Sequence, residues 1–415
     1  MHTHNALTRI RTNTVSLAVP VALLLFCVIM TACTSAQELQ PSPTPPMKPT
    51  LPPIIAATFA PTPIRASDHI IGVSSAYLTI VMYGDFQSAP TLDVARSIEI
   101  IRETYPADVR LIWRNFPQPE NDKALLAAQA AEAAADQGKF WEMHDQLLVH
   151  QSDWSALTVA QFHDKLVDYA KLVGLDVTKF YASIDGGVSL GNLHGALSDA
   201  QALGFKSAPV LLFNSEPYSG RIDLYALDSY ARLRLLEKRW FASQPDLQID
   251  LSKHYTATLT TEKGVVQIAL DAKNAPVTVN NFVFLARAKW YDNITFHLVL
   301  PGSLVQTGDP SGSGLGTPGY TIIDEHNNGL LFDKPGRVAM ASQRGTPNSG
   351  GSQFFITLAQ MQPESDYDGQ FTIFGQVTSG LDVLSQLTPR NTADQQNYPN
   401  PPPGDKLISV MIQEK

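Results

Sequence analysis

A concentration of prolines between residues 34 and 66 divides the chain and limits what its first part can fold into. Its prolines are Pro41, Pro43, Pro45, Pro46, Pro49, Pro52, Pro53, Pro61 and Pro63. Proline fixes φ and donates no backbone hydrogen bond, so no helix or sheet tolerates this density. The segment is typical of a polyproline II spacer that reaches on the order of 100 Å. We interpret residues 34–66 as a stalk; a docking ligand for another domain is the alternative, which only composition supports.

The residues before this stalk have the features of an export signal. Arg9 and Arg11 precede an apolar stretch over residues 15–30. The stretch ends in Met-Thr-Ala-Cys, which resembles the bacterial lipobox, although Met30 stands where leucine is usual. The resemblance implies a lipoprotein signal peptide over residues 1–33 and lipidation at Cys33. An uncleaved signal anchor is the alternative. Either one predicts a membrane-anchored protein outside the bacterial cytoplasm.

Charge and cysteine usage exclude several classes of function. The 415 residues carry a formal net charge of −9 and no basic run, so nucleic acid is not an expected partner. Both cysteines, Cys27 and Cys33, lie before the stalk, which excludes disulfides, thiol nucleophiles and cysteine–metal sites in the folded part. The ten histidines show no metal-ligand spacing. We therefore expect no metal and no cofactor.

Strand and helix patterns alternate over residues 67–242. A buried-strand pattern over 77–83 is followed by a helix that starts near Pro90 and runs to Tyr105, and then by a strand over 109–114. This order predicts a parallel strand pair. Asn121 is the expected cap of a helix over 124–135. Further elements are expected as helices over 159–173 and 190–203, strands over 210–213 and after Gly220, and a closing helix over 224–240.

This first region resembles the thioredoxin-fold family of exported thiol–disulfide oxidoreductases with a helical insertion. The matching words are Tyr-Gly-Asp-Phe-Gln at 83–87, Asp-Gln-Gly-Lys-Phe-Trp at 136–141 and Ser-Ala-Pro-Val at 207–210. In the family a Cys-x-x-Cys motif follows the first word, and here Ser88 and Thr91 replace the two thiols. A hydroxyl cannot carry the redox couple, so we predict a degenerate redox site. The resemblance implies that Pro209 is a cis proline, retained either for the fold alone or for peptide binding.

A different pattern occupies residues 250–415. Alternating strands at 256–260 and 265–270 surround a turn and predict a β-hairpin. A helix is expected after Pro276, glycines crowd residues 302–351, and a closing strand is expected over 407–412. These strands, helix and glycine-rich segments predict a closed β-barrel with flanking helices and long loops.

The second region resembles the cyclophilins, a family of peptidyl-prolyl cis-trans isomerases. Four words match in order, at residues 275–282, 296–310, 340–356 and 368–375. The predicted fold class is therefore multidomain: an α/β thioredoxin-like domain with a helical insertion, followed by a cyclophilin-like closed β-barrel. The glycines of residues 312–316 are explained as a barrel loop, because no strand and helix flank them as a phosphate loop requires. His297 belongs to the second word and is interpreted as a packed residue.

The resemblance implies a candidate site, and it also shows where this chain departs from the family. Gln306 is the implied substrate-holding glutamine and Phe355 the floor of the proline slot, and we take these two as the catalytic pair. The family's catalytic arginine is replaced by Leu298. The other implied substrate-binding positions are Ser303, Leu304, Ala341, Tyr367 and Phe371; of these, Ser303, Leu304, Tyr367 and Phe371 also differ from the usual residues, so the slot is reshaped.

Two functions remain open from the sequence. One is a prolyl isomerase, weakened by Leu298, that assists the folding of exported proline-containing polypeptides. The other is a non-catalytic peptide-binding chaperone or scaffold with two degenerate sites. Gln306 and Phe355 favour the isomerase, whereas Leu298 and the lost Cys-x-x-Cys motif favour the scaffold.

Overall fold

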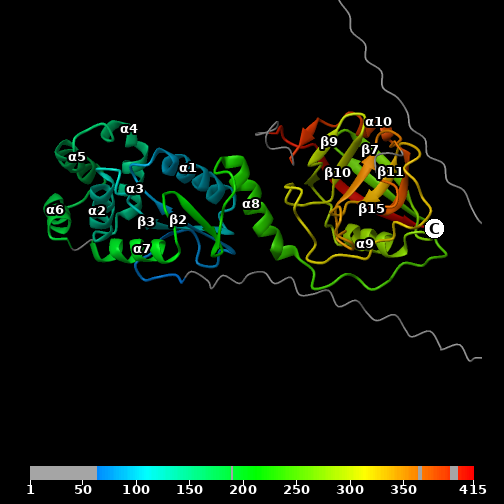
Figure 1. Ribbon diagram of the computed structural model, residues 1–415, viewed down its shortest axis with the longest axis horizontal. Coiled ribbons are helices and arrows are strands. Elements are labelled where there is room, and N and C mark those ends of the chain that lie inside the picture. Colours follow the sequence, from blue (N-terminus) through cyan, green and yellow to red (C-terminus); the bar gives the residue numbers. More distant parts are fainter. Residues whose placement is uncertain (1–62, 188–189, 363–366, 393–400) are drawn as a thin grey trace, which may run out of the picture. The chain divides into compact units, whose positions relative to one another are not determined.

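The computed structural model describes residues 63–187, 190–362, 367–392 and 401–415 (Figure 1). The predicted signal peptide, Cys33 and nearly all of the stalk lie outside these ranges. Within the described ranges no helix has the length and apolar character needed to cross a membrane. The thioredoxin-like and cyclophilin-like regions predicted from the sequence are described in turn.

A five-stranded sheet forms the centre of the first region, in the order β1-β3-β2-β4-β5. Its strands are β1 His69–Ile71, β2 Leu78–Gly84, β3 Val109–Asn115, β4 Val210–Phe213 and β5 Glu216–Pro217. β2 and β3 pair in parallel, as the strand–helix–strand pattern predicts, and the other pairs are antiparallel. The fold class predicted for this region is confirmed.

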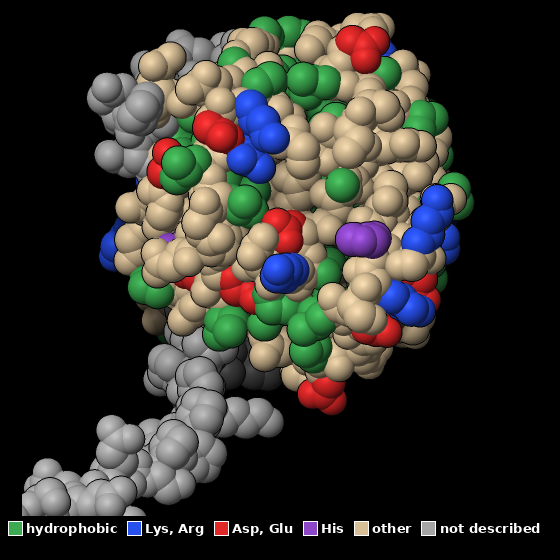
Figure 2. All heavy atoms as spheres, turned by 90° about the vertical axis from the view of Figure 1, so that its right-hand side faces the viewer, with side chains coloured by type: hydrophobic (Ala, Val, Ile, Leu, Met, Phe, Trp, Pro, Cys, Tyr) green, Lys and Arg blue, Asp and Glu red, His purple; other side chains and the backbone are tan. Residues whose placement is uncertain are grey.

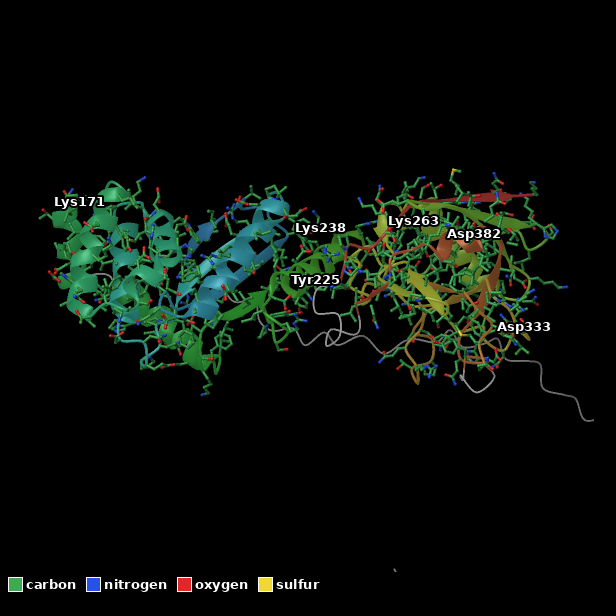
Figure 3. The ribbon with its side chains drawn as sticks, turned by 90° about the horizontal axis from the view of Figure 1, so that it is seen from above. Lys171, Tyr225, Lys238, Lys263, Asp333 and Asp382 are labelled. Carbon is green, nitrogen blue, oxygen red and sulfur yellow. The ribbon has the colours of Figure 1, made fainter. Side chains whose placement is uncertain are left out.

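Helices flank this sheet and form the insertion. They are α1 Ala89–Thr104, α2 Ala124–Ala135, α3 Phe140–Val149, α4 Gln151–Trp154, α5 Val159–Leu172, α6 Val177–Asp185, α7 Leu190–Ala202 and α8 Leu224–Leu236, followed by the 3₁₀ helix η1 Glu237–Arg239. Figure 1 shows α4, α5 and α6 gathered at one end of this region, and Lys171 marks the end of α5 in Figure 3. In α1 a proline lies in the first turn and Val94, Ile98 and Ile101 are buried, so the helix packs on the core along one stripe.

Two local predictions for this region are wrong. Asn121 does not cap α2, whose N-cap is Lys123; the Asn121 amide instead donates to the buried carboxylate of Asp85 at 2.7 Å. The last strand lies before Gly220 rather than after it, at Glu216–Pro217, because residues 214 and 215 have positive φ and make a tight turn directly after β4.

A ten-stranded antiparallel sheet dominates the second region, in the order β14-β9-β10-β12-β11-β13-β7-β6-β15-β8. Its strands are β6 Tyr255–Thr261, β7 Gly264–Leu270, β8 Ile294–Thr295, β9 Leu298–Leu300, β10 Leu304–Thr307, β11 Arg337–Met340, β12 Phe354–Thr357, β13 Ile373–Ser379, β14 Arg390–Asn391 and β15 Lys406–Glu414. Among the described residues the two end strands do not pair with each other. The predicted multidomain fold class with a cyclophilin-like second region is confirmed, and the sheet of that region is curled into a half-barrel, with no described strand pair that closes it.

Two helices pack on this sheet, α9 Pro276–Arg287 and α10 Leu381–Leu384. Phe282 of α9 contacts Tyr291, Phe354 and Phe374 with ring centroids between 5.2 and 5.4 Å apart, in the main core of the region. α10 packs against β7, and Lys263 and Asp382 mark the β6–β7 turn and α10 in Figure 3. The predicted hairpin, the helix after Pro276 and the closing strand are all present.

Candidate active site

Four neighbouring strands of the half-barrel bring the predicted site residues into one row. In the β-ladders Gln306 lies opposite Leu298 on one side and opposite Phe355 on the other, and Phe355 lies opposite Ala339. Residues directly opposite each other in antiparallel strands share a face of the sheet. The row therefore runs Leu298, Gln306, Phe355, Ala339 across β9, β10, β12 and β11, and it joins the two predicted catalytic residues.

This row faces away from the main core of the barrel. The alternate residues Val305, Phe354 and Ile356 belong to that core. Phe355, Leu304 and Ala339 instead belong to a separate small cluster with Phe332 and Ile373, against which Leu298, Leu300, Leu330, Ala341, Met361, Tyr367 and Phe371 pack. We call this set the slot cluster. Leu298, Leu304, Ala341, Tyr367 and Phe371 were all predicted as substrate-binding positions, and the structure brings them together with Phe355.

Aromatic rings surround Phe355. Phe371 and Tyr367 approach it edge-on, with centroid distances of 5.2 and 5.9 Å. Phe332 stacks on it at 5.8 Å with an interplanar angle of 15°. Phe332 has 1% of its surface exposed and Phe355 has 3%. Sequence analysis did not identify Phe332, which lies between two matching words and offered no signal beyond its apolar character.

The amide of Gln306 is held in a defined orientation by Gln353. The Nε2 of Gln353 donates to the carbonyls of Gly314 and Gly316, both at 3.0 Å. Its Oε1 is therefore left to accept from Nε2 of Gln306, also at 3.0 Å. Gln306, only partly buried, keeps its own Oε1 and one N–H for a ligand. Gln353 was not among the predicted site residues, although it lies within the third matching word.

Two hollows flank the segment that follows β11. One has a volume of about 490 Å³ and is lined by Gln306, Ala341 and Gln353, among others. The second has a volume of about 250 Å³ and includes Phe371, Arg344 and Asp324 in its lining. Both share Ser342 and Gln343. Ser303 lines neither hollow; it lies in the β9–β10 turn, where its backbone N–H donates to Leu300 at 3.0 Å.

Arg344 is an exposed residue that places a positive charge at the edge of the slot cluster. Its guanidinium carbon lies 5.4 Å from the ring centroid of Tyr367 and 6.0 Å from that of Phe371. These distances are in the range of cation–π contacts. Sequence analysis did not single out Arg344, because the contact depends on how the loop after β11 folds over the segment before β13.

His297 and Asp309 are two buried polar residues near the site strands. Burial lowers the pKa of His297 to about 4, although the nearby Asp309 carboxylate opposes this shift. Burial by itself raises the pKa of Asp309, but hydrogen bonds from Ser311 and the backbone, together with His297, outweigh it and hold that pKa below its usual value. Asp309 accepts from Gly314 and Gly316 N–H groups at 2.7 and 3.0 Å, so the loop that meets Gln353 is itself fixed. His297 is a packed residue, as predicted.

The predicted degenerate redox site lies at the first turn of α1. The hydroxyl of Thr91 is fully buried and accepts from the backbone of Asp85 at 3.4 Å, while Ser88 is the N-cap residue. The Ala208–Pro209 bond is cis, as the resemblance implied. Because Tyr83 pairs with Val210, Pro209 and the segment after β2 lie at the same edge of the sheet. The structure thus brings Ser88, Thr91 and Pro209 to one end of this sheet.

No group of three or more metal-ligating side chains occurs in the part of the chain that the structure describes. On the face shown in Figure 2, basic and acidic side chains are interspersed and hydrophobic ones lie in small separate groups. The slot cluster itself combines apolar and aromatic side chains with the oriented amide of Gln306 beside them. Gln306 lines the larger hollow, whereas Phe355 lines neither hollow and is 3% exposed.

Comparison with known families divides the chain in two. Residues 256–410 match the family described as cyclophilin type peptidyl-prolyl cis-trans isomerase. Residues 65–230 match a thioredoxin family. Among solved structures, a cyclophilin of Cryptosporidium parvum is 27% identical, with 39% of this chain and 99% of that chain covered and a TM-score of 0.35. A thioredoxin-like oxidoreductase of Silicibacter pomeroyi is 20% identical, with 40% of this chain and 91% of that chain covered and a TM-score of 0.35.

Several curated relatives are peptidyl-prolyl cis-trans isomerases that match over a third or so of this chain. Peptidyl-prolyl cis-trans isomerase-like 1 of Aspergillus niger is 39% identical over 160 residues, which cover 37% of this chain and 93% of that protein. Peptidyl-prolyl cis-trans isomerase A of Mycobacterium tuberculosis is 38% identical over 172 residues, which cover 38% of this chain and 90% of that protein. The chain spans only a quarter of the length of isomerase-like 2 of Cryptococcus neoformans, at 38% identity. Through its second region, which follows a thioredoxin-like domain, this chain belongs to the cyclophilin-type peptidyl-prolyl cis-trans isomerases.

Proposed function

We propose that this protein catalyses cis–trans isomerisation of X-Pro bonds in exported polypeptides, at a rate lowered by Leu298. The observation that carries the proposal is the row in which Gln306, oriented by Gln353, lies directly opposite Phe355. Rotation about an X-Pro bond crosses a barrier of roughly 20 kcal/mol that amide resonance imposes. No nucleophile or cofactor is needed to lower it.

The residues of the site have separate tasks in this reaction. Phe355 and Leu304 present an apolar surface to the proline ring, and Gln306 holds the flanking backbone through its remaining N–H and Oε1. Catalysis requires these contacts to be stronger for the twisted amide than for the planar one. In the family an arginine donates to the twisted bond; Leu298 has no donor, so part of this stabilisation is lost.

The experiment is a protease-free measurement of isomerisation by NMR exchange, with the full chain and a short Ala-Pro peptide. We expect the exchange rate to rise in proportion to protein concentration and to exceed that of the peptide alone. A Gln306→Ala variant that keeps its melting temperature should lose most of this gain. Exchange that does not change with protein concentration would refute the isomerase function.

The second candidate function is peptide binding without catalysis. It is favoured by Leu298, which has no donor for the twisted amide. In that case the chain should broaden or shift the resonances of the proline peptide while leaving the cis–trans exchange rate unchanged. The same NMR experiment therefore separates the two functions.

The remaining parts of the chain support a role outside the cytoplasm. The basic and apolar N-terminus that ends in Cys33 leads us to propose a bacterial lipoprotein anchored to the cell membrane, with residues 34–66 as its stalk. Ser88 and Thr91 lead us to propose that the thioredoxin-like domain has no oxidoreductase activity. The partners of the whole protein would be the proline-containing polypeptides on which the isomerase acts.

A further inference from the structure

We propose that Arg344 is the cationic hydrogen-bond donor of this site and grips a backbone carbonyl next to the target proline. This inference rests on the proposed isomerase function. It assigns to a loop residue part of the role that Leu298, on β9, cannot perform. Arg344 would contact substrate and is therefore proposed as a catalytic residue.

The position of the guanidinium supports this role. It lies 5.4 Å from the ring centroid of Tyr367 and 6.0 Å from that of Phe371. Both rings in turn contact Phe355 edge-on. Tyr367 and Phe371 thus lie between Arg344 and Phe355, the proposed floor of the proline slot. Of the residues that line the two described hollows beside the slot cluster, Arg344 is the one arginine.

Hydrogen bonds fix the backbone of the loop that carries Arg344. The hydroxyl of Ser349 accepts from the N–H of Gln343 at 2.8 Å and donates to the carbonyl of Thr346 at 2.7 Å, which ties the two ends of the loop together. Next to it, the N–H of Asn348 donates to Asp324 at 2.6 Å, and the Asn348 side chain accepts from the N–H of Asp324 at 2.9 Å. A backbone held in this way reduces the reorganisation needed to place the Arg344 side chain when the substrate amide twists.

The chemistry of arginine suits hydrogen-bond donation to a substrate carbonyl. A guanidinium stacked on aromatic rings keeps its N–H groups in a rigid planar fork and remains charged at any physiological pH. These N–H groups can donate to a peptide carbonyl while the ring contacts fix the group in place. A guanidinium that only covered the two rings would contribute to stability and leave catalysis unaffected.

A double-mutant cycle tests the proposal, with the full chain and the same NMR exchange measurement on an Ala-Pro peptide. Arg344→Ala should lower kcat/KM by about 10²-fold, which is the low end of the effect of one preorganised donor, without lowering the melting temperature. Arg344→Lys, which keeps the charge but not the fork, should fall between Arg344→Ala and the wild type. Arg287→Ala removes an exposed arginine of α9 that lines neither of these hollows and should not alter the rate.

The second mutation of the cycle is Leu298→Arg. If Arg344 supplies part of the missing donation, Leu298→Arg should raise the rate by a larger factor in the Arg344→Ala protein than in the wild type. Equal factors in the two backgrounds, or an Arg344→Ala protein as active as the wild type, would overturn the role of Arg344 while leaving the isomerase function intact. Absence of catalysis by the wild type and by Leu298→Arg alike would instead refute the isomerase function itself.

Discussion

The resemblance to the cyclophilins implies that Leu298 is the residue at which the proposed site departs most from its family, because it replaces a donor by a hydrocarbon side chain. Loss of one preorganised donor typically costs about 10²- to 10³-fold in rate, or roughly 3 to 4 kcal/mol. Leu298 already lies in the row with Gln306 and Phe355, so an arginine there would project beside them. We therefore predict that Leu298→Arg raises turnover by at least an order of magnitude.

The control for the added charge is Leu331→Arg, because Leu331 is 52% exposed and lies outside the row. Exchange rates should rise for Leu298→Arg and not for Leu331→Arg. A Leu298→Arg protein that binds the proline peptide as before and shows no faster exchange would favour the peptide-binding function.

Phe355 and its neighbour Phe354 allow the slot to be separated from the core. Both are buried on β12, but they belong to opposite faces of the sheet. Phe355→Leu should lower kcat/KM by about tenfold or more, because it shrinks the apolar floor. Phe354→Leu should lower the melting temperature about as much as Phe355→Leu does, because both substitutions trim a buried side chain. It should change kcat/KM by less than about threefold. Equal losses of activity in the two variants would contradict a specific role for Phe355.

His297 predicts how stability depends on pH. Its pKa is lowered to about 4 by burial, whereas an unfolded histidine titrates near 6.5. The unfolded chain therefore binds the proton more readily, and the stability that neutral His297 provides is complete above about pH 6.5 and is lost as the pH falls toward 4. The loss reaches about 3 kcal/mol. Melting temperatures between pH 7 and 4 should fall less steeply for His297→Gln; identical slopes would contradict this account.

The sequence predicted the residues of this site better than it predicted their surroundings. Gln306, Phe355, Leu304, Tyr367 and Phe371 were identifiable because each lies inside or beside a matching word. Phe332, Gln353 and Arg344 take their roles from tertiary contacts: a ring stack, an amide that must face another amide, and a loop folded over two rings. No spacing along the chain encodes such contacts.

At the scale of elements, the first turn of α1 determines what the thioredoxin-like domain can do. Thr91 is fully buried and Ser88 is the N-cap residue of α1; the resemblance implies that these two positions hold the thiols in the family. We predict that the purified protein catalyses neither insulin reduction nor oxidation of a reduced client. A thioredoxin-like enzyme with an intact Cys-x-x-Cys motif is the positive control. Turnover above that of a no-protein sample would contradict the prediction.

Elements with a strong period were predictable and short ones were not. The 16 residues of α1 and the seven each of β6 and β7 carry clear helical or alternating patterns. β5, β8 and β14 have two residues each, which is too few to show any period.

At the scale of the whole molecule, the proposed membrane anchor lies in the first 66 residues. If Cys33 is the lipidated residue, Cys33→Ser should abolish labelling of the protein by palmitate in a bacterial host. Cys27→Ser, which removes the other cysteine of the chain, is the matched control and should be labelled like the wild type. Unchanged labelling of the Cys33→Ser protein would show that the apolar stretch is a signal anchor or a conventional signal peptide.

The row of Leu298, Gln306, Phe355 and Ala339 has a consequence for heat inactivation. Each of these residues belongs to a strand that is hydrogen-bonded to the next, from β9 through β10 and β12 to β11. The row cannot come apart while those ladders remain intact. Residual isomerase activity, followed on heating, should therefore vanish at the same temperature at which the amide protons of these ladders begin to exchange with solvent.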